Sequence, residues 1–222
     1  MDLDLIDSVP GGLTRRARDF VAVHGIRVDT RSVEERRQRW LDRGIPAHAV
    51  DRMASFQERW GGLLLPPAAQ YDGGPKYLSA RSPGGSASEG WWFDAGPRRT
   101  AVPYAFRIGP TGEFGIHADH WAPLHATVEG WIEALALSHH AAACAERITR
   151  LTGDDVNRLD LDAMEPVREV RGLSDTWWRS TDSLVALCTG EARCLSFPRG
   201  RTAWIYSGLD QWGLYGVGDE MT

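Results

Sequence analysis

The chain has 222 residues, of which 42% are hydrophobic, so it is long enough to bury a core of its own. Its formal net charge is -5, and residues 61–222 hold 14 basic against 20 acidic residues, which argues against a nucleic-acid partner because phosphate binding needs a basic face. No run of about 18 apolar residues is present, and the N-terminal MDLDLIDS lacks the features of a signal peptide, so we expect a cytoplasmic protein without membrane association.

Helices dominate the prediction for the N-terminal part of the chain. Apolar residues recur at helical spacing over residues 13–24, 32–44 and 46–60. Ser32 and Glu35 form a capping box for the second helix, and Pro46 opens the third, which ends at Gly61-Gly62. We expect residues 1–60 to pack as N-terminal helices on a main domain.

The middle of the chain predicts strands. The run 63–65 is expected as a strand or a buried connection, and strands are expected over residues 76–80, 91–93, 104–108 and 114–116. The last two flank the turn Pro110-Thr111-Gly112 and alternate apolar with polar residues, which is typical of a hairpin. The Gly- and Ser-rich run 84–88 is expected to be a loop.

A long helix follows the hairpin. Thr127 is a suitable N-cap, and Val128, Trp131 and Leu135 lie at helical spacing. We expect this helix to bury Trp131 and to continue to about Gly153, which would complete an α+β main domain over residues 61–153.

Residues 154–222 predict a β-rich C-terminal extension. We expect a meander with strands over residues 183–187, 192–197 and 202–206. The sequence leaves open whether this meander extends the main sheet or forms a sheet of its own. In either case the predicted class is α+β, with helices packed against a largely antiparallel sheet.

Histidines and carboxylates gather after the hairpin. His117, Asp119, His120 and His125 lie within nine residues, and such side chains are zinc or iron ligands. His117 and Asp119 share one strand face, whereas His120 falls at the strand end, so convergence would require a bend. We therefore expect no metal and no cofactor, and a metal-dependent enzyme using His117, Asp119 and His120 is the alternative.

Other catalytic signatures are missing from the sequence. The three cysteines lack the spacing of a zinc site, and no GxSxG motif is present. Cys144 lies on the apolar face of the predicted helix, where a thiol is usually inert packing. We therefore predict no catalytic residues.

Two features predict a protein-binding surface. Adjacent tryptophans at 91–92 and 177–178 cannot both point into one core if they lie on strands, and an outward tryptophan is typical of interfaces. The run from Asp154 to Glu169 has a net charge of -4 and would attract a basic partner. The candidate partner-binding residues are Trp92, Trp178, Asp154, Asp155, Asp160, Asp162 and Glu165.

Three stretches resemble the SUKH superfamily. They are PAHAVDRMASFQERWGGLLLPP from Pro46, IGPTGEFGI from Ile108, and PLHATVEGWIEALAL from Pro123. The resemblance covers roughly residues 45–150, and Thr127 and Val128 depart from the usual Ser and Phe. It implies an α+β fold and a non-enzymatic binding module, such as an immunity protein that neutralises a bacterial polymorphic toxin of the nuclease or deaminase class.

The leading functional hypothesis is therefore an immunity-type inhibitor that binds a toxin domain through a basic surface of that domain. A bacterial source fits the 24 arginines and the single lysine, Lys76, which are typical of GC-rich coding. A regulatory scaffold with the same fold is a further alternative. The sequence does not indicate an oligomeric state.

Overall fold

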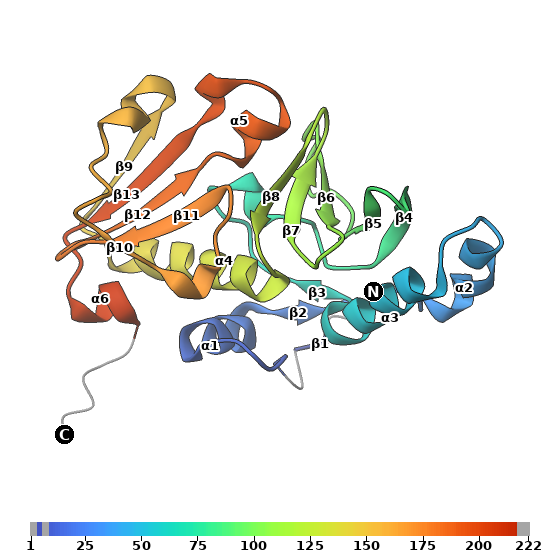
Figure 1. Cartoon of the computed structure of the whole chain (residues 1–222). Coiled ribbons are helices and arrows are strands. Elements are labelled where there is room, and N and C mark those ends of the chain that lie inside the picture. Colours follow the sequence, from blue (N-terminus) through green and yellow to red (C-terminus); the bar gives the residue numbers. More distant parts are fainter. Residues whose placement is uncertain (1–3, 6–8, 217–222) are drawn as a thin grey trace.

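The computed structural model describes residues 4–5 and 9–216, so most of the MDLDLIDS segment lies outside the described residues (Figure 1). The fold is α+β, as predicted, and its sheets are antiparallel. The helices are α1 (Arg15–His24), α2 (Glu34–Leu41), α3 (Ala47–Trp60), α4 (Val128–Cys144), α5 (Gly190–Cys194) and α6 (Gln211–Tyr215). Short 3-10 turns are η1 (Tyr71–Gly73), η2 (Gly153–Arg158), η3 (Arg168–Val170) and η4 (Pro198–Gly200).

The strands of the described residues form one small and two five-stranded sheets. The small sheet contains β1 (Asp4–Leu5), β2 (Ile26–Arg27) and β3 (Leu63–Leu64). The central sheet is a meander of β4 (Arg81–Ser86), β5 (Gly90–Asp94), β6 (Ala105–Ile108), β7 (Phe114–His117) and β8 (Trp121–His125). The C-terminal sheet has the order β10-β11-β12-β13-β9, with β9 (Arg147–Thr152), β10 (Glu165–Pro166), β11 (Asp175–Arg179), β12 (Ser183–Cys188) and β13 (Thr202–Ser207).

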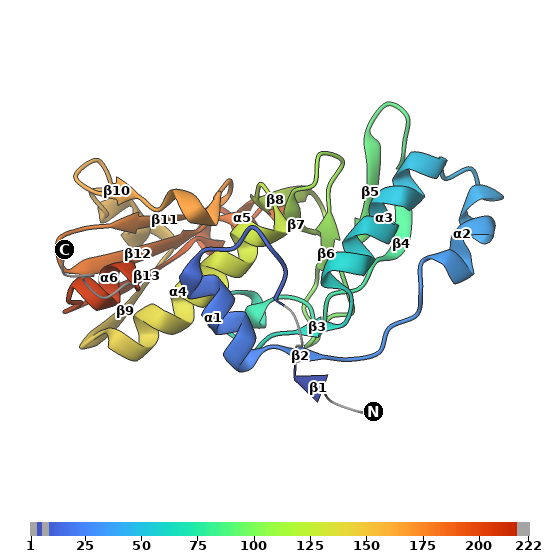
Figure 2. The ribbon, with the colours of Figure 1, turned by 90° about the horizontal axis from the view of Figure 1, so that it is seen from below.

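Helix α4 connects the two large sheets (Figure 2). Its residues Val128, Trp131 and Ile132 belong to a core that also holds the central sheet and helices α1 and α3. Leu137 and Ala141, further along the helix, belong to a second core beneath the C-terminal sheet. Because one helix contributes to both cores, the two sheets are held in a fixed relation.

Local chemistry explains where the main helices begin. The Thr14 hydroxyl accepts a hydrogen bond from the Ala17 amide, and the Thr127 hydroxyl accepts one from the Gly130 amide. Thr14 also donates from its backbone amide and its hydroxyl to the buried carboxylate of Glu133 on α4, at 2.6 and 2.8 Å. These bonds satisfy a carboxylate that is 3% exposed and fix α1 against α4.

Several predicted elements are confirmed. The three N-terminal helices, the hairpin of β6 and β7, the strand at the first tryptophan pair and the start of α4 at Thr127 all lie where the sequence placed them. The predicted capping box is not formed, because the N-cap of α2 is Val33, which makes no side-chain capping hydrogen bond. Trp131 is 6% exposed, as expected for a core residue.

Other predictions are wrong. Residues 76–80 form no strand, whereas the Gly- and Ser-rich run 84–88, expected as a loop, contributes to the hairpin of β4 and β5. Gly84 accounts for this, because a Cβ there would lie 2.5 Å from the Trp92 ring, which covers the backbone of the opposing strand. Residues 192–197, expected as a strand, begin within helix α5, and β8 was not predicted.

The predicted end of the long helix is also wrong. Helix α4 stops at Cys144, and Arg147–Thr152 forms strand β9 at an edge of the C-terminal sheet. In this strand Ile148 and Leu151 face opposite sides of the sheet, although their spacing of three residues also fits one face of a helix. The C-terminal residues therefore form a sheet of their own and do not extend the central sheet.

Candidate protein-binding surface

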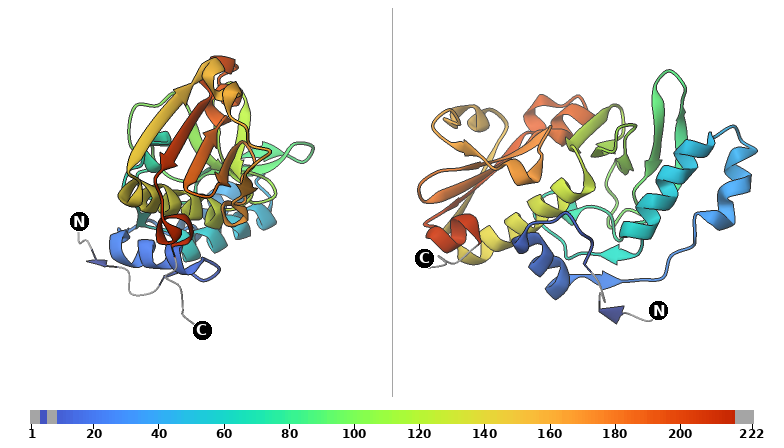
Figure 3. Two further views of the ribbon diagram at one scale, coloured as in Figure 1. Left: turned by 90° about the vertical axis from the view of Figure 1, so that its left-hand side faces the viewer. Right: turned by 60° about the horizontal axis from the view of Figure 1, so that its bottom comes forward.

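The second tryptophan pair lies on β11 in the C-terminal sheet. Trp177 is 4% exposed and packs in the second core, where its ring stacks on Tyr206 with centroids 5.8 Å apart. Trp178 points to the other side of the sheet, next to Val185 and Ile205 in the neighbouring strands, and is partly exposed. We call this side, which faces away from α4, the outer face of the C-terminal sheet (Figure 3, left).

The acidic run connects the two edges of the same sheet. It leaves edge strand β9 through η2 and reaches edge strand β10, whose Pro166 lies opposite Trp178. The Asp160, Asp162 and Glu165 side chains are exposed and form no salt bridge with any described residue. Asp155 pairs with Arg158 at 3.1 Å, and Asp154 lies 4.0 Å from Arg201.

The structure thus places Trp178 and the acidic run on one sheet, but it does not bring Trp92 to them. Trp92 lies on β5 of the central sheet, on the side opposite Phe93 and its core. The Arg107 guanidinium lies 3.6 Å from the centroid of the Trp92 ring, and its Nε lies 3.3 Å from an Asp94 carboxylate oxygen. Trp92 is therefore already paired with a cation of its own sheet.

The histidine cluster does not converge. His117 ends β7, whereas Asp119 and His120 lie in the exposed turn before β8. Partial burial and the nearby Arg107 lower the pKa of His117. Within residues 4–5 and 9–216, no group of three or more His, Cys, Asp or Glu side chains is arranged to hold a metal ion.

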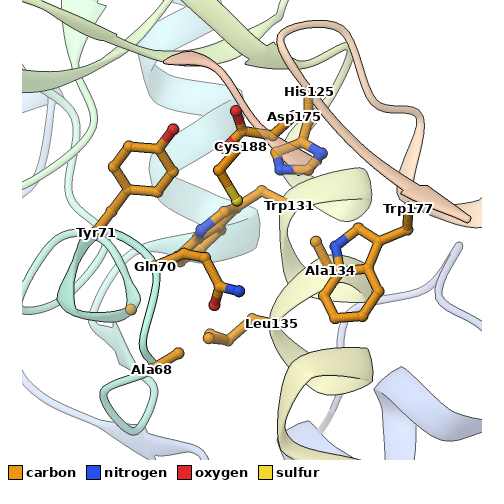
Figure 4. Close-up of a pocket in the computed structure, with 11 residues that line it drawn as sticks. Ala68, Gln70, Tyr71, His125, Trp131, Ala134, Leu135, Asp175, Trp177 and Cys188 are labelled. Atoms are coloured by element: carbon orange, nitrogen blue, oxygen red, sulfur yellow. The ribbon is translucent and has the colours of Figure 1, made fainter. Parts of the chain in front are cut away.

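His125, the remaining histidine of this run, lies in a different place. It is 3% exposed and faces a cavity of about 30 Å³ at the junction of the two large sheets and α4 (Figure 4). Asp175 from β11, Cys188 from β12 and Tyr71 from η1 line the same cavity. A space of this size accommodates about two water molecules, so it is too small for an organic substrate.

The Asp175 carboxylate binds the start of helix α5 at this junction. Its carboxylate accepts hydrogen bonds from the backbone amides of Thr189 and Gly190, at 2.9 and 3.0 Å, where helix α5 begins. Burial raises the pKa of Asp175 to about 6, and the hydrogen bonds that it accepts oppose this shift. The carboxylate therefore anchors α5 to the C-terminal sheet.

The neighbouring groups do not form a nucleophile and base. Burial, and then the negative charge of Asp175, raise the pKa of the Cys188 thiol, which keeps it protonated. Burial lowers the pKa of His125 to about 4, and its Nδ1 lies 2.8 Å from the Val170 carbonyl oxygen, to which it donates. No hydrogen bond between described residues joins Cys188 to His125.

The sequence did not single out Tyr71 or Asp175, and Cys188 was considered only as one of the three cysteines that lack the spacing of a zinc site. Asp175 could have been found from the sequence. It lies two residues before the buried Trp177 on the same strand, and residues two apart on a strand face the same side, so its side chain points towards the same core. The tertiary junction that collects these side chains depends on contacts between distant segments. It could not be read from local spacing.

No helix among the described residues has the length and apolar character needed to cross a membrane. Comparison of the chain with protein-family models, curated proteins and solved structures gave no match.

Proposed function

We propose that this protein is a non-enzymatic binding module, and that the outer face of the C-terminal sheet, with its acidic connection, binds a protein with a basic surface. The observation that carries the proposal is the combination of the exposed, unpaired carboxylates of Asp160, Asp162 and Glu165 with the partly exposed Trp178. Carboxylates that lack an internal partner are free to attract a cationic surface, and a tryptophan supplies an anchor that loses water on binding.

The nature of the partner rests on the resemblance to the SUKH superfamily. It favours an immunity-type inhibitor that acts in the bacterial cytoplasm on a toxin domain of the nuclease or deaminase class. A toxin that acts on nucleic acid needs a basic cleft, and an acidic binding surface complements such a cleft.

The experiment is affinity purification of the full chain from its source cells, followed by mass spectrometry. The double variant Asp160→Asn/Asp162→Asn and the single variant Trp178→Ala serve as baits beside the parent. Arg107→Ala, on the central sheet, is the control bait. We expect a basic protein that is retained by the parent and the control and is depleted with the two surface variants.

An acidic partner would contradict the proposal, as would a basic partner retained equally by all folded baits. A toxin-neutralisation assay then tests the finer proposal. The chain should suppress the activity of the captured protein at equimolar amounts, and an active partner in a stable complex would instead indicate a scaffold.

A further inference from the structure

Strand β9 is an edge strand with a free row of backbone groups. It pairs with β13 on one side, and no strand of the described residues pairs with its other side. The Gly153 amide donates to the Arg201 carbonyl just beyond the strand, and bonded pairs alternate along an antiparallel ladder. The amides and carbonyls of Ile148, Arg150 and Thr152 therefore point to the free edge.

A groove follows the inner side of the same strand. A cavity of about 370 Å³ lies between β9, β13, helix α4 and the segment at Pro67 and Ala68. Its walls include Ile148, which is 44% exposed, and Trp204. A smaller cavity of about 60 Å³ continues along the strand past Trp204 to Arg150.

The free edge and the groove are formed by the same residues of β9. Ile148 and Arg150 direct their side chains into the groove, and the same two residues direct their backbone groups to the free edge. A peptide strand placed along β9 would therefore form backbone hydrogen bonds and insert alternate side chains beside Ile148 and Trp204.

The charge of the β9 edge indicates which kind of peptide segment it would bind. Arg147 and Arg150 are exposed and form no salt bridge within the described residues, so the strand is basic in a chain of net charge -5. Arg150 lies on the inner side with the groove, whereas Arg147 lies on the outer side. The Arg150 guanidinium lies 5.3 Å from the centroid of the Trp204 ring. The nearest carboxylate in sequence, Glu146, packs over Gly208 beside β13 and so lies away from the free edge.

We propose that β9 is a second docking site, which adds an extended, acidic and partly apolar segment of a partner protein as the sixth strand of the C-terminal sheet. Arginines on an edge disfavour pairing with a second copy of the same strand and favour a segment that carries carboxylates. This site uses the free edge and the inner side of β9, whereas Trp178 lies on the outer face, and the proposal does not depend on the function proposed above.

The test uses the full chain and two short blocked peptides, one alternating Val and Glu and the other alternating Val and Lys. Binding is followed by titration calorimetry and by amide hydrogen exchange. We expect the Val-Glu peptide to bind about tenfold more tightly than the Val-Lys peptide. It should slow exchange of the Ile148, Arg150 and Thr152 amides, because these amides face the free edge, and should leave Thr149 unchanged.

Two variants separate charge from backbone pairing. Arg150→Glu should weaken binding of the Val-Glu peptide about tenfold, whereas Arg168→Glu, at an exposed arginine that follows β10 at the opposite edge of the sheet, should not. Thr152→Pro removes one outward amide without a change of charge and should also weaken binding. Equal binding of both peptides, unchanged exchange of the three edge amides, or equal affinity of Arg150→Glu and the parent would each overturn the proposal.

Discussion

Trp131 on α4 stacks on Phe114 of β7, with ring centroids 4.4 Å apart and ring planes inclined by 19°. The indole also packs against the chain at Gly74, where a Cβ would lie 2.5 Å from the ring. The ring therefore links the central sheet, α4 and the segment that follows β3. This contact makes the packing around Trp131 sensitive to truncation.

Trp131→Ala should lower the free energy of unfolding by about 3–5 kcal/mol, because it removes a buried aromatic ring from a packed core. Denaturant titration of the purified variant measures this loss. Trp212→Ala is the control, since Trp212 is 50% exposed and its removal should cost much less. Equal stability of the two variants would contradict the role assigned to Trp131.

Asp175→Asn should change how stability depends on pH. Burial raises the pKa of Asp175 from an ordinary value of 3.8 to about 6, so the folded state holds this proton more tightly than the unfolded state. The contribution of Asp175 to the free energy of unfolding therefore falls as pH rises from about 4 to about 6. Asparagine keeps an acceptor for the Thr189 and Gly190 amides without this titration.

We thus expect the stability of Asp175→Asn, relative to the parent, to increase between pH 4 and pH 6 and to be constant above. Each unit of pKa shift corresponds to about 1.4 kcal/mol, so the total change should not exceed a few kcal/mol. Chemical denaturation across this range measures it, with the exposed Asp160→Asn as control. A flat difference between Asp175→Asn and the parent would show that Asp175 does not titrate as described.

His125→Asn should act in the same pH window with the opposite sign. Burial lowers the pKa of His125 from 6.5 to about 4, so the folded state holds the proton less tightly than the unfolded state. Its contribution to stability is therefore full above pH 6.5 and is lost as pH falls towards 4. The asparagine amide can still donate to the Val170 carbonyl.

The stability of His125→Asn, relative to the parent, should accordingly increase as pH falls from 6.5 to 4, whatever its value at neutral pH. The same denaturation series gives this result, and His120→Asn, an exposed histidine, is its control. If both histidine variants show the same pH profile, His125 does not have the buried, neutral state inferred from the structure.

A fourth prediction concerns metal content. The purified protein should carry no stoichiometric transition metal, because His117, Asp119 and His120 do not converge. Elemental analysis should find well below one zinc or iron per chain, and a chelator should leave the melting temperature unchanged. About one metal ion per chain, lost in His117→Ala, would instead support the alternative of a metal-dependent enzyme.

The sequence predicted elements whose signals are local. Thr127 marks the start of α4 because an N-cap bond reaches only a few residues, and Pro110-Thr111-Gly112 marks a hairpin because the turn joins adjacent strands. The end of α4 was missed, since residues 145–153 carry apolar side chains that fit either a helix or a strand. Pairing with β13, more than fifty residues later, decides in favour of the strand.

The candidate binding surfaces were also predicted only as far as local sequence signals allow. Alternation on a strand correctly separates Trp177 from Trp178, because neighbouring side chains on a strand face opposite sides. It cannot tell that Arg107 covers Trp92 from a neighbouring strand, nor that β9 becomes a sheet edge. Both facts depend on the order of strands in the sheets.

The last prediction separates Trp178 on the outer face from the acidic connection by their effects on binding kinetics. Asp160 and Asp162 are exposed and solvated, so they should attract a basic partner at a distance and remain hydrated at the rim of the complex. Asp160→Asn/Asp162→Asn should therefore lower the association rate and reduce its dependence on salt. Trp178 is partly buried in the free protein and offers a rigid ring, so Trp178→Ala should raise the dissociation rate, at a cost of about 2 kcal/mol or more.

Surface plasmon resonance with the captured partner at low and high salt measures both rates, and Trp92→Ala, whose ring is covered by Arg107, is the matched control. A larger loss of affinity for Trp92→Ala than for Trp178→Ala would move the binding surface to the central sheet.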